Sequence, residues 1–204
     1  MKDAQGREIK YLRVSVTDRC NLRCKYCMPN GIECVEHKDI LSFEEIRQIA
    51  VCGARLGITK IRLTGGEPLA RKGCPELIRM LKEIPGIEKI AMTTNGTLVR
   101  AILPELVEAG LDEINISLDT LDAGTFASIT GQDLLPEVLL AIDAALAAGL
   151  KVKVNAVSMP DTDWKRLITL AKDKPVDVRF IELMPIGEAV SYTHLRAHET
   201  LRHL

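Results

Sequence analysis

Three cysteines within eight residues are the part of this sequence best suited to chemistry. Cys20, Cys24 and Cys27 follow the pattern Cys-x-x-x-Cys-x-x-Cys. Thiolates bind soft metals and iron–sulfur clusters. Three of them on one short loop can hold three irons of a four-iron cluster and leave the fourth iron without a protein ligand. Such an open iron can chelate a substrate or cofactor and pass an electron to it.

A zinc site is the alternative interpretation of the same cysteines. Cys34 or His37 could complete a four-ligand zinc knuckle in a non-enzymatic binding module. Structural zinc sites usually have paired Cys-x-x-Cys arms, whereas this sequence has one triplet and no second pair. The spacing favours a cluster and leaves the zinc-stabilised module open.

A second candidate ligand loop is Gly65-Gly66-Glu67-Pro68, which directly follows a β-rich run. Adjacent glycines let a backbone approach a ligand closely. A plain strand-to-helix turn is the alternative. If the preceding run is a parallel strand, this loop and the cysteine loop lie at the same end of the sheet, where ligands bind.

The elements that must position these loops alternate between strand and helix. We expect strands over 11–16, 58–64, 87–93, 111–118, 150–157 and 176–183, and helices over about 43–56, 75–83, 98–109, 134–148 and 161–172. Alternation of this kind implies parallel strands with right-handed crossovers. The predicted fold class is α/β, either an open twisted sheet or a partial (β/α)6 TIM-type barrel, because a full barrel needs ~250 residues.

Charge and hydropathy set the broad class. The 204 residues include 27 Lys and Arg against 28 Asp and Glu, so the formal net charge is -1. That balance gives no bulk electrostatic reason to bind nucleic acid or a membrane surface. No apolar run approaches the ~18 residues of a membrane span, and Met1–Lys10 is too polar for a secretory signal. We expect a cytoplasmic protein, and the sequence leaves a homodimer open.

Taken with their flanks, these loops resemble the radical S-adenosylmethionine (radical SAM) superfamily and, within it, the GTP 3′,8-cyclase family of molybdenum cofactor biosynthesis. The matching strings are LRVSVTDRCNLRCKYCMP (12–29), IRLTGGEPLARK (61–72), TTNG (93–96), INISLDTL (114–121), VKVNAV (152–157) and RFIELMPIG (179–187). TDRCN, SLDTL and RFIELMP are specific for the cyclases. Another radical SAM enzyme, such as a peptide-modifying one, is the lesser alternative.

The resemblance implies that Cys20, Cys24 and Cys27 hold a 4Fe-4S cluster whose open iron binds S-adenosylmethionine. Contacts to S-adenosylmethionine carry over to Tyr26, Gly66, Ser117 and Met184. With an electron from a one-electron reductant, the sulfonium would give methionine and a 5′-deoxyadenosyl radical. That radical would abstract the 3′ hydrogen of GTP, and attack on C8 of guanine would give 3′,8-cyclo-7,8-dihydro-GTP, a lyase-type reaction.

Contacts to GTP carry over to four residues, Arg13, Arg62, Thr93 and Lys153. The three cations lie in strands otherwise rich in apolar residues, and a buried cation is costly unless it is paired. A triphosphate is a suitable partner, which Arg can bind through two hydrogen bonds. An internal salt bridge, for example from Arg62 to Glu67 or Asp119, is the alternative.

The resemblance also predicts the domain organisation. Residues 1–188 should form the radical SAM core domain, and 189–204 an atypical tail outside it that carries His194, His198 and His203. The C-terminal part of the family, with a second cysteine triplet and a second cluster that binds guanine, has no counterpart in the sequence. We therefore expect the chain to bind one cluster and S-adenosylmethionine without completing the cyclisation.

Overall fold

A parallel sheet forms the centre of the molecule. The computed structural model describes residues 2–31, 35–36, 39–159 and 162–183. In these residues six strands pair in sequence order, all parallel. They are β1 (Tyr11–Ser15), β2 (Lys60–Thr64), β3 (Lys89–Thr94), β4 (Glu113–Ser117), β5 (Lys151–Ser158) and β6 (Asp177–Glu182).

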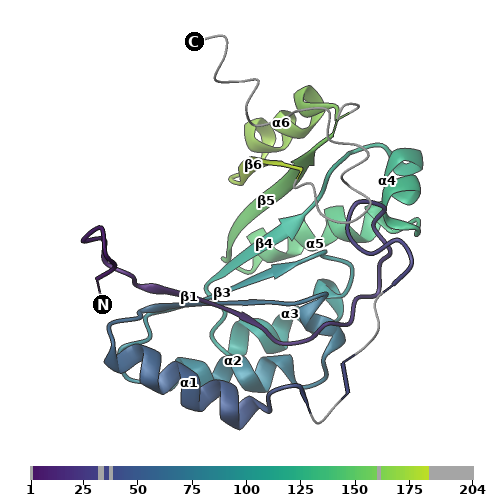
Figure 1. Cartoon of the computed structure of the whole chain (residues 1–204). Helices are drawn as coiled ribbons and strands as arrows, with labels where there is room; N and C mark the ends of the chain where they lie inside the picture. The colour runs from purple at the N-terminus through teal and green to yellow at the C-terminus, as the bar shows by residue number, and fades with distance from the viewer. Residues whose placement is uncertain (1, 32–34, 37–38, 160–161, 184–204) are drawn as a thin grey trace.

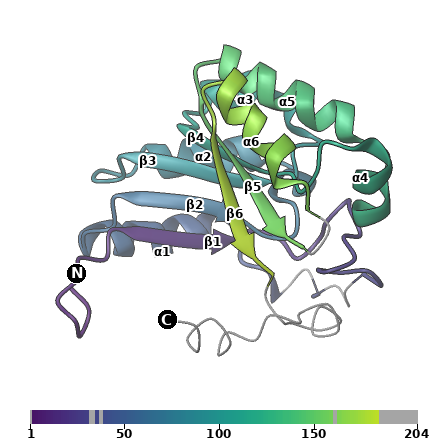
Figure 2. The ribbon, with the colours of Figure 1, turned by 90° about the horizontal axis from the view of Figure 1, so that it is seen from above.

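Helices connect successive strands and lie along one side of the curved sheet (Figures 1 and 2). They are α1 (Phe43–Arg55), α2 (Cys74–Lys82), α3 (Val99–Glu108), α4 (Ala123–Thr130), α5 (Leu135–Ala147) and α6 (Trp164–Asp173), with a short 3-10 helix η2 (Pro68–Ala70) after β2. This arrangement confirms the predicted α/β fold with a partial (β/α)6 barrel. No helix in the described residues has the length and apolar character to cross a membrane.

Capping residues mark where two of the helices begin, α1 and α4. Before α1, the Ser42 hydroxyl accepts a hydrogen bond from the Glu45 backbone, and the Glu45 carboxylate accepts one from the Ser42 backbone. This reciprocal cap marks the start of the helix. Helix α4 was not predicted, because its sequence AGTFASIT contains poor helix formers. Its start is nevertheless marked by Asp122, whose carboxylate accepts from the Thr125 backbone at 2.8 Å.

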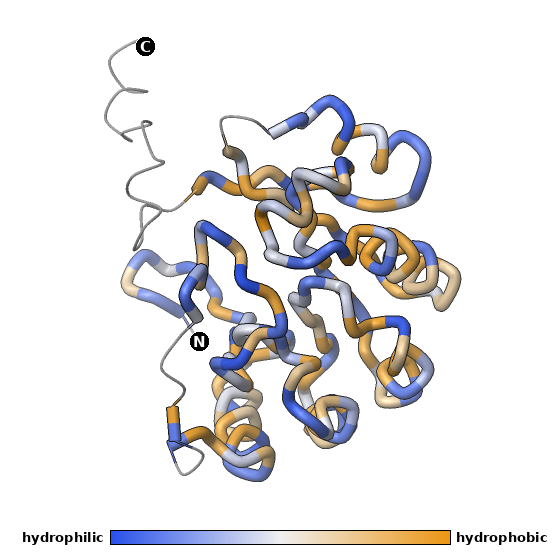
Figure 3. The backbone as a smooth tube through the Cα atoms, turned by 90° about the vertical axis from the view of Figure 1, so that its right-hand side faces the viewer, coloured by the Kyte–Doolittle hydropathy of each residue, from blue (hydrophilic) through white to orange (hydrophobic). Residues whose placement is uncertain are grey.

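The hydrophobic core fills the space between the sheet and the helices. Ile114 and Ile116 of β4 are fully buried there, as are Leu77 and Leu81 of α2. Hydrophobic and hydrophilic stretches alternate along the helices in Figure 3, as expected for helices with one buried face. Because side chains alternate across a strand, the polar residues between the isoleucines of β4 face the other side of the sheet.

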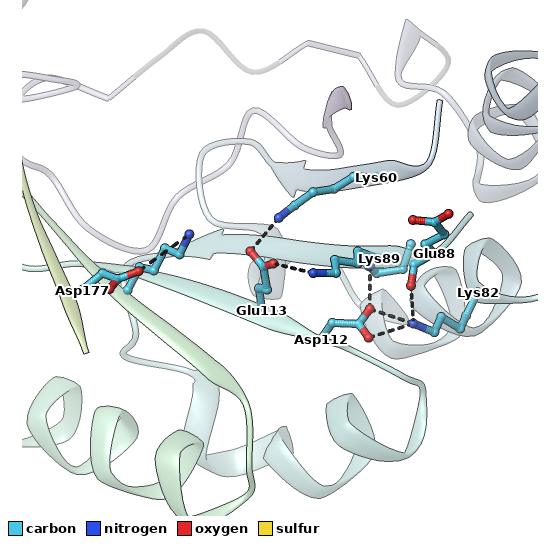
Figure 4. A network of polar contacts seen from close by, with 9 residues as sticks. Lys60, Lys82, Glu88, Lys89, Asp112, Glu113 and Asp177 are labelled. Atoms are coloured by element: carbon cyan, nitrogen blue, oxygen red, sulfur yellow. Dashed lines mark hydrogen bonds and ion pairs between the residues drawn. The ribbon is translucent and has the colours of Figure 1, made fainter. Parts of the chain in front are cut away.

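Ion pairs cross the sheet at the amino ends of the strands (Figure 4). The Glu113 carboxylate, at the first position of β4, lies 2.6 Å from Lys60 Nζ and 3.9 Å from Lys89 Nζ, and both lysines begin their own strands. Burial alone would raise the pKa of Glu113, but the lysine charges hold it below its usual range. The opposite, carboxyl end of the sheet carries the cysteine loop.

Candidate active site

The cysteine loop begins directly after β1. Hydrogen bonds from the Cys27 and Met28 backbones to the Cys24 carbonyl, 2.9 and 3.0 Å long, close a turn between the second and third cysteines. Cys20 and Cys24 are half-buried and Cys27 is exposed. Two N–H groups donate to Cys20 Sγ, the backbone of Leu22 at 3.4 Å and the side-chain amide of Asn95 at 3.9 Å.

Burial makes two of these thiols, those of Cys24 and Cys27, hard to ionise without a positive partner. Burial, followed by the charges of Asp119, Cys20 and Cys27, raises the pKa of Cys24 to about 12. Burial, followed by the charge of Cys20, also raises the pKa of Cys27. Because metals bind thiolates rather than thiols, a bound metal group would supply a positive charge that favours the ionised form of these side chains.

The spacing of the thiols bears on which metal group fits. Among the described residues, no three His, Cys, Asp or Glu side chains gather as ligands around a single ion. In an iron–sulfur cluster each thiolate binds a different iron, so the three thiols do not have to converge on a single ion. Cys34 and His37, the ligands of the alternative zinc site, lie outside the described residues.

The two adjacent glycines bring the end of β2 against the cysteine loop. A Cβ atom at Gly65 would lie 2.4 Å from the Thr17 carbonyl oxygen, and one at Gly66 would lie 2.3 Å from that of Arg19. Hydrogen bonds from the Gly66 backbone to Thr17 and from the Glu67 backbone to Arg19, 2.8 and 2.7 Å long, join the two loops. The close approach that the structure shows at Gly66 is therefore to the cysteine loop.

Glu67 organises the strand ends from beneath this contact. Its carboxylate is fully buried and accepts hydrogen bonds from the Leu69 backbone, the Thr94 hydroxyl and the Asn95 backbone. Burial raises its pKa in spite of these bonds. The Asn95 side chain in turn donates to Asn21 Oδ1 at 2.8 Å. This network ties the end of β3 to the cysteine loop.

A cavity of about 920 Å³ opens on the polar side of the sheet. It brings together six of the residues singled out in the sequence: Arg13, Tyr26, Arg62, Thr93, Ser117 and Lys153. The strand register explains this gathering, because Arg13 pairs with Arg62 across β1 and β2, and Asn115 lies between Thr93 and Lys153 on the central strands.

Two of the cations that line this cavity are buried. Arg62 is 7% exposed, its Nη1 lies 3.4 Å from the Thr93 hydroxyl, and its Nε has no hydrogen-bond partner. Lys153 is 8% exposed, and Asp177 Oδ2 lies 3.9 Å from its Nζ. Burial, followed by the charge of Arg179, lowers the pKa of Lys153. The cavity is therefore suited to an anionic ligand.

Among the described residues, Arg62 forms no salt bridge with Glu67 or Asp119, the two partners named in the alternative interpretation. The Glu67 carboxylate accepts from Thr94 and Asn95, and the Asp119 carboxylate accepts from the Tyr26 hydroxyl and the Val157 backbone. Arg13 differs from the other cations because it is exposed, since β1 is an edge strand of the sheet.

Residues 14–173 match the family described as the Radical SAM superfamily. The chain belongs to the radical SAM superfamily. Among its relatives, the GTP 3′,8-cyclase of Alkaliphilus oremlandii is 50% identical over 194 residues, which are 93% of this chain and 61% of that protein. The GTP 3′,8-cyclase of Moorella thermoacetica is 49% identical over 196 residues, 94% of this chain and 61% of that protein. The chain thus spans about three fifths of their length.

Solved structures show the same radical SAM fold at low sequence identity. Streptococcus suis SuiB bound to S-adenosylmethionine superposes with a TM-score of 0.78 at 18% identity, covering 95% of this chain and 45% of SuiB. Methylornithine synthase (PylB) gives a TM-score of 0.70 at 20% identity, covering 86% of this chain and 53% of that protein.

Several residues remain to be placed in this radical SAM chain. Met184 and the tail 189–204 lie outside the described residues. Asn95 and Asp119, which the sequence indicates only as polar organisers of the strand-end loops without a specific role, contact Cys20 and Tyr26 of the cysteine loop. Their positions after the ends of β3 and β4 are the signal for that interpretation, because ligand sites form at the carboxyl ends of parallel strands.

Proposed function

We propose that this chain is the S-adenosylmethionine-cleaving part of a GTP 3′,8-cyclase, a radical SAM lyase of molybdenum cofactor biosynthesis. The supporting relatives are near 50% identical and carry that name. The observation that carries the proposal is the pair of buried polar atoms without partners, Arg62 Nε and Asn115 Oδ1, that face the same cationic cavity beside Lys153. Such atoms are costly unless a ligand satisfies them.

The residues present fit the cofactors that this function needs. Cys20, Cys24 and Cys27 would hold a 4Fe-4S cluster, and the N–H donors at Cys20 are the kind that stabilise cluster sulfur. When bound, the cluster and S-adenosylmethionine together supply a carbon radical able to abstract a hydrogen atom. We assign S-adenosylmethionine contacts to Tyr26, Gly66, Ser117 and Met184, of which Tyr26 and Ser117 line the cavity.

The chain's own residues would bind and orient the nucleotide. Arg62 and Lys153 offer buried charge to phosphate oxygens, and Arg13 adds a third cation from the edge strand. The Thr93 hydroxyl, 3.4 Å from Arg62 Nη1, can share a phosphate or ribose oxygen. Held between these groups and the cysteine loop, GTP would have its ribose oriented toward that loop.

The proposal includes the setting of the reaction. Residues 1–188 form the radical SAM core domain, and 189–204 lie outside it. The partners are GTP and a one-electron reductant, and the location is the cytoplasm. The absence of nucleic-acid and membrane partners is part of the same proposal, supported by the formal net charge of -1.

Anaerobic reconstitution with iron and sulfide tests the proposal. We expect about four irons and four sulfides per chain, release of methionine and 5′-deoxyadenosine under reducing conditions, and GTP binding that weakens in Arg62→Ala and Lys153→Ala. A variant with all three cysteines of the triplet changed to alanine is the control and should incorporate no cluster. A colourless protein with one zinc, or cluster uptake by the triple variant, would contradict the proposal.

A further inference from the structure

A buried carboxylate anchors the cysteine loop to the sheet. Asp119, two residues beyond the end of β4, is 7% exposed. Its Oδ2 accepts a hydrogen bond from the Tyr26 hydroxyl at 2.6 Å, and its Oδ1 accepts one from the Val157 backbone at 2.7 Å. Hydrogen bonds to an ionised acceptor are short and roughly twice as strong as neutral ones. One side chain therefore ties the loop to β4 and β5 together.

The position of Tyr26 makes its hydrogen bond to Asp119 relevant to ligand binding. Tyr26 lies between Cys24 and Cys27, within the turn that carries two of the three thiols. Tyr26, Ser117 and Asp119 line both the large cavity and a small pocket of about 30 Å³ beside Cys24. The side chains of Tyr26 and Asp119 thus belong to the lining of both the large cavity and the small pocket.

The backbone next to Asp119 is held in place by β5 and the core. The Leu118 backbone donates to the Asn155 carbonyl at 2.9 Å, which extends the pairing of β4 with β5 by one residue. Leu118 is 1% exposed and fixes the backbone on the core side. The loop backbone is held separately, since Arg23 and Lys25 donate to the carbonyls of Thr130 and Ile129 at 2.9 Å each. Losing the Asp119 contact should therefore free the Tyr26 ring while the loop stays docked.

We propose that Asp119 is a positioning residue that acts through Tyr26, holding the phenol ring as the cavity wall against which S-adenosylmethionine binds. This inference rests on the proposed function, because it needs a bound cluster and S-adenosylmethionine. A purely structural role for Asp119 would show in stability alone. A positioning role would show in the affinity for S-adenosylmethionine of protein that has a full cluster.

Three variants separate these roles. Tyr26→Phe removes only the hydroxyl, and Asp119→Ala removes both hydrogen bonds. Asp119→Asn keeps both, since its Oδ1 can accept from Val157 while its Nδ2 donates to the Tyr26 hydroxyl oxygen. Asp122→Ala is the matched control, because Asp122 is an exposed aspartate three residues further on that caps α4 through Thr125.

The measurement is the dissociation constant of S-adenosylmethionine, read from the change that it causes in the electron paramagnetic resonance spectrum of the reduced cluster. We expect about tenfold weaker binding, about 1.4 kcal/mol, in Tyr26→Phe and Asp119→Ala. The double variant Tyr26→Phe/Asp119→Ala should bind S-adenosylmethionine no more weakly than Asp119→Ala, because both changes break the same hydrogen bond between Tyr26 and Asp119. Asp119→Asn should stay within about threefold of the unmodified protein, and Asp122→Ala should lose stability but not affinity.

Two results would overturn the positioning role. Unchanged affinity in Tyr26→Phe would show that the hydroxyl contact does not matter to the ligand. An Asp119→Asn affinity as weak as that of Asp119→Ala would show that the negative charge itself acts, without Tyr26. Failure of the unmodified chain to incorporate a cluster would instead contradict the proposed function, so the two failures are distinguishable.

Discussion

Changing Arg62 to methionine should stabilise the fold while it weakens nucleotide binding. Arg62 is 7% exposed, its Nε has no partner, and its Nη1 makes one long hydrogen bond to Thr93. Replacing buried ion pairs by apolar side chains of similar volume is often neutral or stabilising by about 1–4 kcal/mol, because the desolvation cost of the charges is removed, and the same cost applies to Arg62. We expect a gain of about 1–3 kcal/mol in the free energy of unfolding of the ligand-free chain.

The same change should cost GTP affinity, because a hydrogen bond to a charged group contributes about 1.5–3 kcal/mol. That corresponds to a dissociation constant about 10- to 150-fold higher. Urea unfolding measures the first effect and isothermal titration with GTP the second. Arg100→Met is the control, since Arg100 forms an exposed 2.9 Å pair with Glu137 on the helical side and should change the free energy of unfolding by less than about 1 kcal/mol.

Destabilisation by Arg62→Met would refute the reasoning, because it would show that the guanidinium is satisfied within the protein. An Arg62→Met variant with a stabilised fold and unchanged GTP affinity would distinguish the claim about stability from the claim about nucleotide binding. It would confirm that the charge is costly and contradict its assignment to the nucleotide.

Three further predictions address the strand ends and the cysteine loop. Gly66→Ala should lower the free energy of unfolding by about 1–3 kcal/mol and reduce cluster incorporation, since its Cβ would lie 2.3 Å from a backbone oxygen. As a control, Gly124→Ala in α4 should leave the free energy of unfolding, measured with urea, unchanged or higher. An equal decrease in the free energy of unfolding in Gly66→Ala and Gly124→Ala would contradict the steric argument. The pKa of Glu113 is lowered in the fold, so its contribution to stability is present above its unfolded pKa of about 4.3 and is lost as the pH falls through the folded value. Glu113→Gln should therefore flatten the acid side of the stability profile, and an unchanged slope would refute this. Asn95→Ala removes a donor to Cys20 Sγ and should make the cluster potential more negative, on the order of 40 mV for a bond of about 1 kcal/mol. A redox titration followed by electron paramagnetic resonance would show this shift. A potential equal to that of the unmodified protein would contradict an effect of the Asn95 hydrogen bond on the cluster.

The regular elements could be predicted because their signals are local. The capping box at Ser42 and Glu45 and the β-rich runs lie within a few residues of the elements that they specify. Helix α4 escaped prediction because Gly124 and its hydroxyl-bearing neighbours are weak helix formers. Its stability comes from packing on α5 and from capping, which a propensity argument does not weigh.

The site was predictable in its residue types but not in its contacts. A resemblance could assign Arg62 and Lys153 to a ligand, and the strand register places both in one cavity. The bond from Tyr26 to Asp119 joins residues 93 apart in sequence, so no local spacing reveals it. Glu67 shows the same limit, because this carboxylate, which the sequence offers only as an alternative partner for Arg62, accepts backbone and hydroxyl hydrogen bonds instead.

The central claim is that three thiols hold a cluster whose remaining iron binds S-adenosylmethionine. Electron–nuclear double resonance on the reduced, reconstituted chain tests it most directly, using S-adenosylmethionine labelled with nitrogen-15 at the amino group. The account predicts a hyperfine coupling between the cluster electron spin and the labelled nitrogen. A chain that carries four irons and shows no such coupling at saturating ligand would contradict it.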